Sequence, residues 1–205
     1  GRKSFNAEIS NWNTAKVTSL YSTFSGATSF TGDGVSNWDT PKVTTLYKTF
    51  YGATSFTGDG VSNWDTSSVT SLSNTFEGAT SFTGDGVSNW NTSIVTNLYF
   101  TFYGSTSFNG DISLWDVSQV SSDFDSDTFY NTNSLHECTK KLMYDSWYTN
   151  QSLDMNTYSS WATPTCCIMT RSELKVHVDQ WIVNSTNHPC GEVIGDWDVS
   201  RVTDM

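Results

Sequence analysis

The largest hydrophobic side chains recur along the chain with a period of 26 residues. The tryptophans keep this spacing at Trp12, Trp38, Trp64 and Trp90, and Trp115 follows after 25 residues. Two series of phenylalanines share the period, at Phe24, Phe50, Phe76 and Phe102 and at Phe30, Phe56, Phe82 and Phe108. A repeat of this length is typical of solenoids, in which each coil packs on the next. We therefore expect Trp12, Trp38, Trp64 and Trp90 to stack in one buried column.

The pattern changes within each coil. Val17, Leu20 and Phe24 have helical spacing, and Gly26 follows where a helix commonly ends. Two glycines in the motif "TGDGV" then break any helix, and the segment up to Trp38 is expected to be extended with its apolar residues facing inward. Each coil therefore predicts a short helix, a turn and a short strand. The predicted fold is a leucine-rich-repeat-like α/β solenoid, and a pure β-solenoid is the alternative.

The period divides the chain into three parts. Residues 1–130 contain about five coils. Residues 131–167 predict a helical, disulfide-bearing cap, because a capping box and hydrophobic residues at helical spacing occur there: Ser134, Glu137, Leu135, Cys138 and Leu142. Residues 168–205 open with a second capping box and predict another helix followed by the start of a further solenoid block.

Two segments carry a resemblance to a known family. "FNGDISLWDVSQV" from Phe108 and "GDWDVSRVTDM" from Gly195 are similar to the BspA-type surface repeat of bacterial and microalgal surface proteins. The resemblance extends over about 1–130 and 168–205. It implies a relative of the leucine-rich repeats and a surface protein linked to adhesion or to no known activity. The middle coils depart from the pattern, with "GDG" in place of "DI" and Leu in place of the usual Met.

Composition excludes several classes of partner. The formal net charge is −11, only 15% of residues are charged, and the basic residues form no cluster. Nucleic acid is therefore not expected as a partner, because its phosphates are bound by Lys and Arg. An anionic membrane surface is equally unexpected, and no apolar run is long enough to insert into a bilayer. The chain begins at Gly1 without a signal peptide, so we expect a mature product or an excerpt.

Four cysteines lie outside the coils, at Cys138, Cys166, Cys167 and Cys190. Their spacing matches no zinc site, and two disulfides are the better interpretation. Three connectivities are possible, of which Cys138–Cys166 with Cys167–Cys190 is our first choice. Disulfides form in oxidising compartments, so the chain is expected to be extracellular or at the cell surface.

Repeated aspartates and isolated histidines are the candidates for chemistry. Asp33, Asp59, Asp85 and Asp111 form one series, and Asp39, Asp65 and Asp116 another. A ladder of calcium sites is conceivable, since Ca²⁺ prefers oxygen ligands, but caps of local turns are the favoured interpretation. No cofactor is therefore expected. The histidines, His136, His177 and His188, belong to no catalytic motif, so we do not expect an enzyme.

Hydroxyl groups and sequons suggest further roles. One series of threonines and one of serines repeat with the coils: Thr28, Thr54, Thr80 and Thr106, and Ser29, Ser55, Ser81 and Ser107. Such an array could order water as in ice-binding proteins, bind sugars, or only solvate the surface. N-glycosylation sequons occur at Asn91, Asn150 and Asn184, of which the last two are favoured because they lie in expected loops of the disulfide-bearing part.

The two ends carry matching parts of a coil. "GRKSF" from Gly1 matches "GATSF" from Gly26, and "WDVSRVTDM" from Trp197 matches "WNTAKVTSL" from Trp12. Incomplete coils invite addition of another chain. We therefore expect head-to-tail self-assembly, or tandem blocks of a longer chain, with Val202 and Met205 packed on Phe5 and Ile9 of the next block.

The sequence thus predicts an extracellular structural protein, a glycosylated surface or fibre-forming subunit. The alternative is a surface adhesin or carbohydrate-binding module that uses the repeated face, and an ice-binding protein is a minor alternative.

Overall fold

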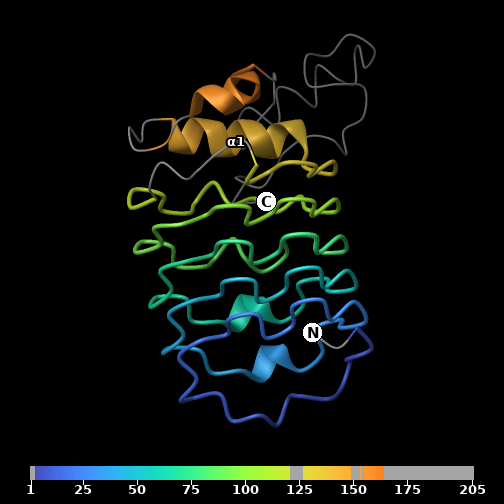
Figure 1. Cartoon of the computed structure of the whole chain (residues 1–205). Coiled ribbons are helices and arrows are strands. Elements are labelled where there is room, and N and C mark those ends of the chain that lie inside the picture. Colours follow the sequence, from blue (N-terminus) through green and yellow to red (C-terminus); the bar gives the residue numbers. More distant parts are fainter. Residues whose placement is uncertain (1–2, 121–126, 149–152, 154, 164–205) are drawn as a thin grey trace, which may run out of the picture.

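Successive turns of backbone lie one above another in a computed structural model of the chain (Figure 1). The structure describes residues 3–120, 127–148, 153 and 155–163. A helix, α1 (Glu137–Trp147), lies across the end of the stack, and the short helix η3 (Met155–Ala162) lies beside it. Two one-turn 3₁₀ helices, η1 (Val35–Asn37) and η2 (Val61–Asn63), lie within the coils.

The predicted fold class is wrong. In the described part of the chain the coils contain neither α-helix nor strand, so the molecule is neither a leucine-rich-repeat-like α/β solenoid nor a β-solenoid. Single parallel bridges are all that connects the coils in a strand-like way, at Ser19–Thr45, Thr45–Ser71 and Ser71–Asn97. The coils are built instead from consecutive tight turns.

The backbone hydrogen bonds explain why no helix forms at Val17–Phe24. Alternate amides donate to the next coil, as from Ser22 to the Tyr47 carbonyl (3.0 Å) and from Phe24 to the Thr49 carbonyl (2.9 Å). The amides between them close three-residue turns, as from Thr23 to the Leu20 carbonyl (3.1 Å). Ser22 also has a left-handed φ of 53°, which interrupts a right-handed helix. The helical spacing of hydrophobic residues therefore reflects a chain of turns.

The segment expected to be extended before Trp38 turns as well. Gly34 (φ 88°) leads into η1, and Gly60 (φ 89°) leads into η2. A Cβ on Gly60 would lie 2.8 Å from the Ser36 backbone nitrogen of the preceding coil. Glycine is required there because the backbone is left-handed and the coils approach closely.

The core consists of aromatic columns parallel to the stack. Neighbouring tryptophan rings have centroids 6.0 Å apart at Trp12–Trp38 and Trp38–Trp64, and 6.3 Å apart at Trp64–Trp90. Each indole from Trp38 onward donates to a carbonyl of the previous coil, as from Trp64 to Val35 (3.0 Å). The expected column exists, but its first member is not buried, since Trp12 is 51% exposed. Two phenylalanine columns run beside it, with paired rings 3.8–4.1 Å apart within a coil.

Helix α1 covers the hydrophobic end of the columns. Met143 and Trp147 belong to the buried core, and the Trp147 ring lies 6.4 Å from that of Phe129. The Ser146 hydroxyl donates to the Ser113 carbonyl (2.6 Å). The predicted capping box does not form: the N-cap is His136, whose Nδ1 accepts from the Cys138 amide (3.2 Å). The second predicted helix and further block, 168–205, lie outside the described residues.

No described helix is long and apolar enough to cross a membrane.

Candidate functional site

The described chain contains only some of the predicted site residues. Asn91 is exposed in a turn, and its Oδ1 accepts from the Ser93 amide (3.1 Å) and hydroxyl (2.8 Å). Cys138, in the first turn of α1, is disulfide-bonded. Ile9 is buried and Phe5 is half-buried. The remaining predicted residues lie outside the described residues: Asn150, Asn184, Cys166, Cys167, Cys190, Trp197, Val202 and Met205.

The aspartate series close local turns. Asp33, Asp59 and Asp85 each accept from the threonine two residues earlier, at 2.9–3.0 Å. Asp65 and Asp116 each accept from the amide two residues later, at 2.9 Å. The serine side chain and amide at that position, Ser67 or Ser118, lower the pKa of the two carboxyl groups. Among the described residues, no group of three or more His, Cys, Asp and Glu could hold a metal ion.

The threonine series are bonded to the backbone. Thr54, Thr80 and Thr106 donate their hydroxyl hydrogens to the carbonyl of the equivalent threonine in the previous coil, each at 3.3 Å. The hydroxyl of Thr28 donates likewise to Lys3 (3.1 Å). These hydroxyls join neighbouring coils, so their donor capacity is already used within the molecule.

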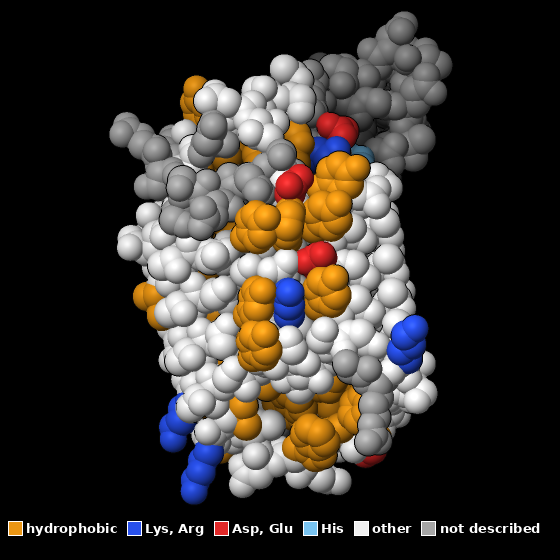
Figure 2. All heavy atoms as spheres, in the orientation of Figure 1, with side chains coloured by type: hydrophobic (Ala, Val, Ile, Leu, Met, Phe, Trp, Pro, Cys, Tyr) orange, Lys and Arg blue, Asp and Glu red, His pale blue; other side chains and the backbone are white. Residues whose placement is uncertain are grey.

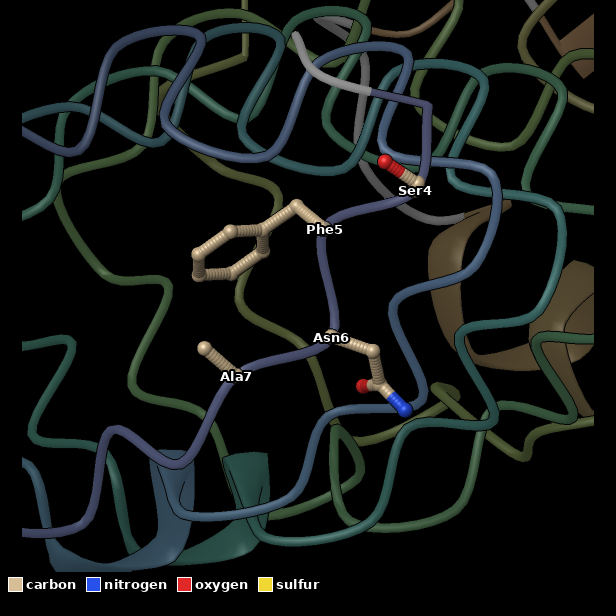
Figure 3. A pocket seen from close by; sticks show the side chains of 4 residues that line it. All are labelled: Ser4, Phe5, Asn6 and Ala7. Atoms are coloured by element: carbon tan, nitrogen blue, oxygen red, sulfur yellow. The ribbon is translucent and has the colours of Figure 1, made fainter.

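The first coil has a small hollow of about 310 Å³, lined by Ser4, Phe5, Asn6 and Ala7 (Figure 3). The Phe5 ring points to the interior, with centroids 6.0 Å from Phe24 and 5.7 Å from Phe30. The side-chain oxygen of Asn6 accepts from the Thr31 amide (3.2 Å) and hydroxyl (3.1 Å). This lining has no titratable side chain, so it offers no means of catalysis.

A different surface stands out from the rest of the molecule, and we call it the aromatic face. It follows the segment of each coil just before the glycine at the coil junction, along the stack axis. Figure 2 shows hydrophobic side chains gathered in such a band, with single basic and acidic side chains among them. Its members are Tyr21, Tyr47, Lys48, Tyr51, Ser73, Asn74, Glu77, Tyr99, Phe100, Tyr103 and Tyr130.

The exposed rings of the aromatic face contact one another from coil to coil. The rings of Tyr21 and Tyr47 have centroids 5.3 Å apart, and those of Tyr103 and Tyr130 are 5.0 Å apart and stacked. Tyr21 is 60% exposed and Tyr130 56%. Exposed apolar side chains in a continuous patch mark interaction surfaces more often than scattered ones do.

The three closest copies of the coil differ mainly on this face. Residues 26–51, 52–77 and 78–103 share the same first thirteen residues, "GATSFTGDGVSNW", including exposed ones such as Ser36 and Asn37. Every difference lies in the second part of the coil, and it includes all three positions of the aromatic face: Tyr47, Ser73 and Tyr99; Lys48, Asn74 and Phe100; Tyr51, Glu77 and Tyr103. Exposure alone does not explain this, because other exposed positions are unchanged. The sequence analysis missed this site, which a comparison of the copies position by position could have found.

The backbone of the aromatic face favours residues other than those present. Its middle position has a left-handed φ, of 57° at Lys48 and 53° at Phe100. A bulky residue such as Phe is disfavoured there, whereas Asn and Gly are tolerated. Phe100 is therefore retained despite its backbone conformation, which is consistent with a role for its ring at the surface.

Comparison with known proteins gives a family but no function. No curated protein and no solved structure matches the chain. A family described as "Mycoplasma protein of unknown function, DUF285" matches residues 1–61 and 55–166, which is most of the chain. The protein therefore belongs to the DUF285 family.

Proposed function

We propose that the protein is an extracellular recognition module that binds its partner through the aromatic face. The observation that carries this proposal is the ladder of exposed rings, in contact from coil to coil, at the positions where the copies differ. Tyrosine supplies a large, rigid contact area and a polar hydroxyl, and it is enriched in binding surfaces. A stack of coils holds such rings at fixed spacing, so that one extended ligand can meet several of them.

Two further observations support a position at the cell surface. Cys138 is disulfide-bonded, and disulfides persist in oxidising compartments. The BspA-type resemblance of "FNGDISLWDVSQV" also favours a surface protein that takes part in adhesion. Glycosylation at Asn91, Asn150 and Asn184 belongs to the same proposal. Asn91 is exposed, as an acceptor for a glycan must be.

The head-to-tail assembly expected from the sequence stays a prediction. It requires Trp197, Val202 and Met205, which lie outside the described residues. The aromatic face is therefore a better basis for a proposed function than the ends of the chain.

Binding of the full chain to an array of glycans and extracellular-matrix proteins tests the proposal. The double variant Tyr47→Ala/Tyr51→Ala removes neighbouring rings of the aromatic face, and we expect at least about tenfold weaker binding to whichever ligand the wild type selects. Tyr148→Ala is the matched control, because Tyr148 is an exposed tyrosine of the α1 C-cap outside this face. Equal loss in the control, or wild-type binding by the double variant, would contradict the proposal.

A further inference from the structure

The coil of residues 52–77 interrupts the aromatic face with a polar group. The three positions are Ser73, Asn74 and Glu77, whereas the coil before has Tyr47, Lys48 and Tyr51 and the coil after has Tyr99, Phe100 and Tyr103. A carboxylate is thereby placed between two sets of rings.

Hydrogen bonds within the coil fix this carboxylate. The Ser73 hydroxyl donates to Asn74 Oδ1 (2.7 Å), and Asn74 Nδ2 donates to Glu77 Oε2. Ser73 and Asn74 are only 5% and 7% exposed, so the donors cannot turn away. Asn74 also suits the left-handed backbone of its position (φ 55°). Glu77 is half-buried, and no hydrogen bond from the described residues reaches its Oε1. That oxygen is oriented and available as an acceptor.

The neighbouring charges select the kind of ligand. Lys48 Nζ lies 5.2 Å from the Tyr47 ring centroid and 5.3 Å from that of Tyr51. The Tyr47 phenol and, less strongly, the charge of Glu77 raise the pKa of Lys48, so the ammonium stays charged. A cationic ligand at Glu77 would meet Lys48, and a polyanion would meet the net charge of −11. An uncharged, hydroxyl-bearing ligand meets neither obstacle.

Building on the proposed recognition function, we propose that Glu77 forms a subsite for a neutral glycan, whose hydroxyl groups donate to its carboxylate while its sugar rings lie on the flanking tyrosines. Pyranose rings combine an apolar C–H face with polar edges, and this matches a carboxylate set between exposed aromatic rings. Hydrogen bonds to an ionised carboxylate are stronger than those between neutral groups. Ser73 and Asn74 are positioning residues that hold the acceptor in place.

Affinity electrophoresis of the full chain through native gels tests this inference. The gels contain a neutral polysaccharide (mannan, galactan or β-glucan), cationic chitosan or anionic alginate. We expect at least one neutral polymer to retard the wild type, and Glu77→Gln to weaken that retardation about tenfold. Glu137→Gln is the matched control, since it makes the same change of charge on the exposed surface of α1. Thermal unfolding of each variant checks that the fold is intact.

The outcomes separate this inference from the function on which it rests. If Tyr47→Ala/Tyr51→Ala abolishes retardation and Glu77→Gln does not, the aromatic face binds glycans without the subsite, and the inference is wrong. Retardation by chitosan alone, lost in Glu77→Gln, overturns it in favour of a cationic ligand, and retardation by alginate alone overturns it in favour of an anionic one. If no polysaccharide retards the wild type, the inference fails; binding to a matrix protein on the array would still preserve the proposed function.

Discussion

Single side chains join the coils of this molecule to one another, and a buried threonine series shows what each bond contributes. Thr14, Thr40 and Thr66 donate to carbonyls of the next coil at 3.0–3.1 Å, namely those of Asp39, Asp65 and Asn91. Thr92, the next member, is 3% exposed and its hydroxyl has no partner among the described residues. The following coil is one residue shorter before its tryptophan, and the series ends there with the buried Val117.

Replacement of these threonines by valine has opposite expected effects. Thr66→Val should lower the free energy of unfolding by about 1 kcal/mol, because the Asn91 carbonyl loses its donor while the shape is nearly kept. Thr92→Val should be neutral or stabilising, because a buried hydroxyl without a partner is removed. Urea unfolding followed by tryptophan fluorescence measures both. Equal losses would show that the Thr92 hydroxyl has a partner after all.

At the scale of the element, the turn after each buried tryptophan depends on a carboxylate or amide oxygen. Asp65 and Asp116 accept from the amide two residues on at 2.9 Å, and Asn91 makes the same bond at 3.1 Å. The chemical nature of the acceptor therefore varies between coils while the turn does not. Only the carboxylates couple the turn to pH, since hydrogen bonds to Ser67 and Ser118 lower the pKa of Asp65 and Asp116.

Acid should weaken these turns. The folded pKa lies below the ordinary value of 3.8, so the unfolded chain binds more protons in this range. The stabilisation is complete above that value and is lost as the pH falls through the lower folded pKa. The double variant Asp65→Asn/Asp116→Asn, which copies the side chain of Asn91, should keep the turns and remove this part of the pH dependence. Urea midpoints measured from neutral to strongly acidic pH test this, and unchanged slopes for wild type and double variant would contradict the assignment. The effect should be small because both groups face water.

At the scale of the whole molecule, the coils are nearly interchangeable because their contacts repeat. The Phe50–Phe76 and Phe76–Phe102 rings lie 5.6 and 5.8 Å apart, and the tryptophan column keeps 6.0–6.3 Å throughout. Each coil therefore meets the same surface on either side. Stability of such a stack is roughly a sum over coils and the contacts between neighbours.

Deletion of residues 52–77 should consequently leave a folded protein. It removes one complete coil and joins Tyr51 to Gly78, restoring the sequence "FYGATSF" that already occurs at Phe50–Phe56. We expect a cooperative unfolding transition with a lower urea midpoint and a smaller m-value, since less surface is buried. A half-coil deletion of residues 65–77 places unlike positions opposite one another and should abolish cooperative unfolding. Similar behaviour of the two deletions would argue against stacking in register.

The sequence by itself determined the period and the identity of the core residues. Large aromatic groups at fixed spacing can be buried only by equivalent groups of the neighbouring coils, so Trp38, Trp64 and Trp90 stack as the spacing predicts. A helix in residues 131–167 was likewise expected from hydrophobic spacing, although its N-cap is His136 and not Ser134.

Only the tertiary structure decided the backbone conformation and the aromatic face. The spacing at Val17, Leu20 and Phe24 is compatible with a helix, but the amides of Ser22 and Phe24 find partners in the next coil, which local sequence cannot reveal. Tyr21, Tyr47 and Tyr51 read in sequence as ordinary members of a repeat. They become one surface because stacking places positions 26 residues apart side by side and leaves their rings exposed.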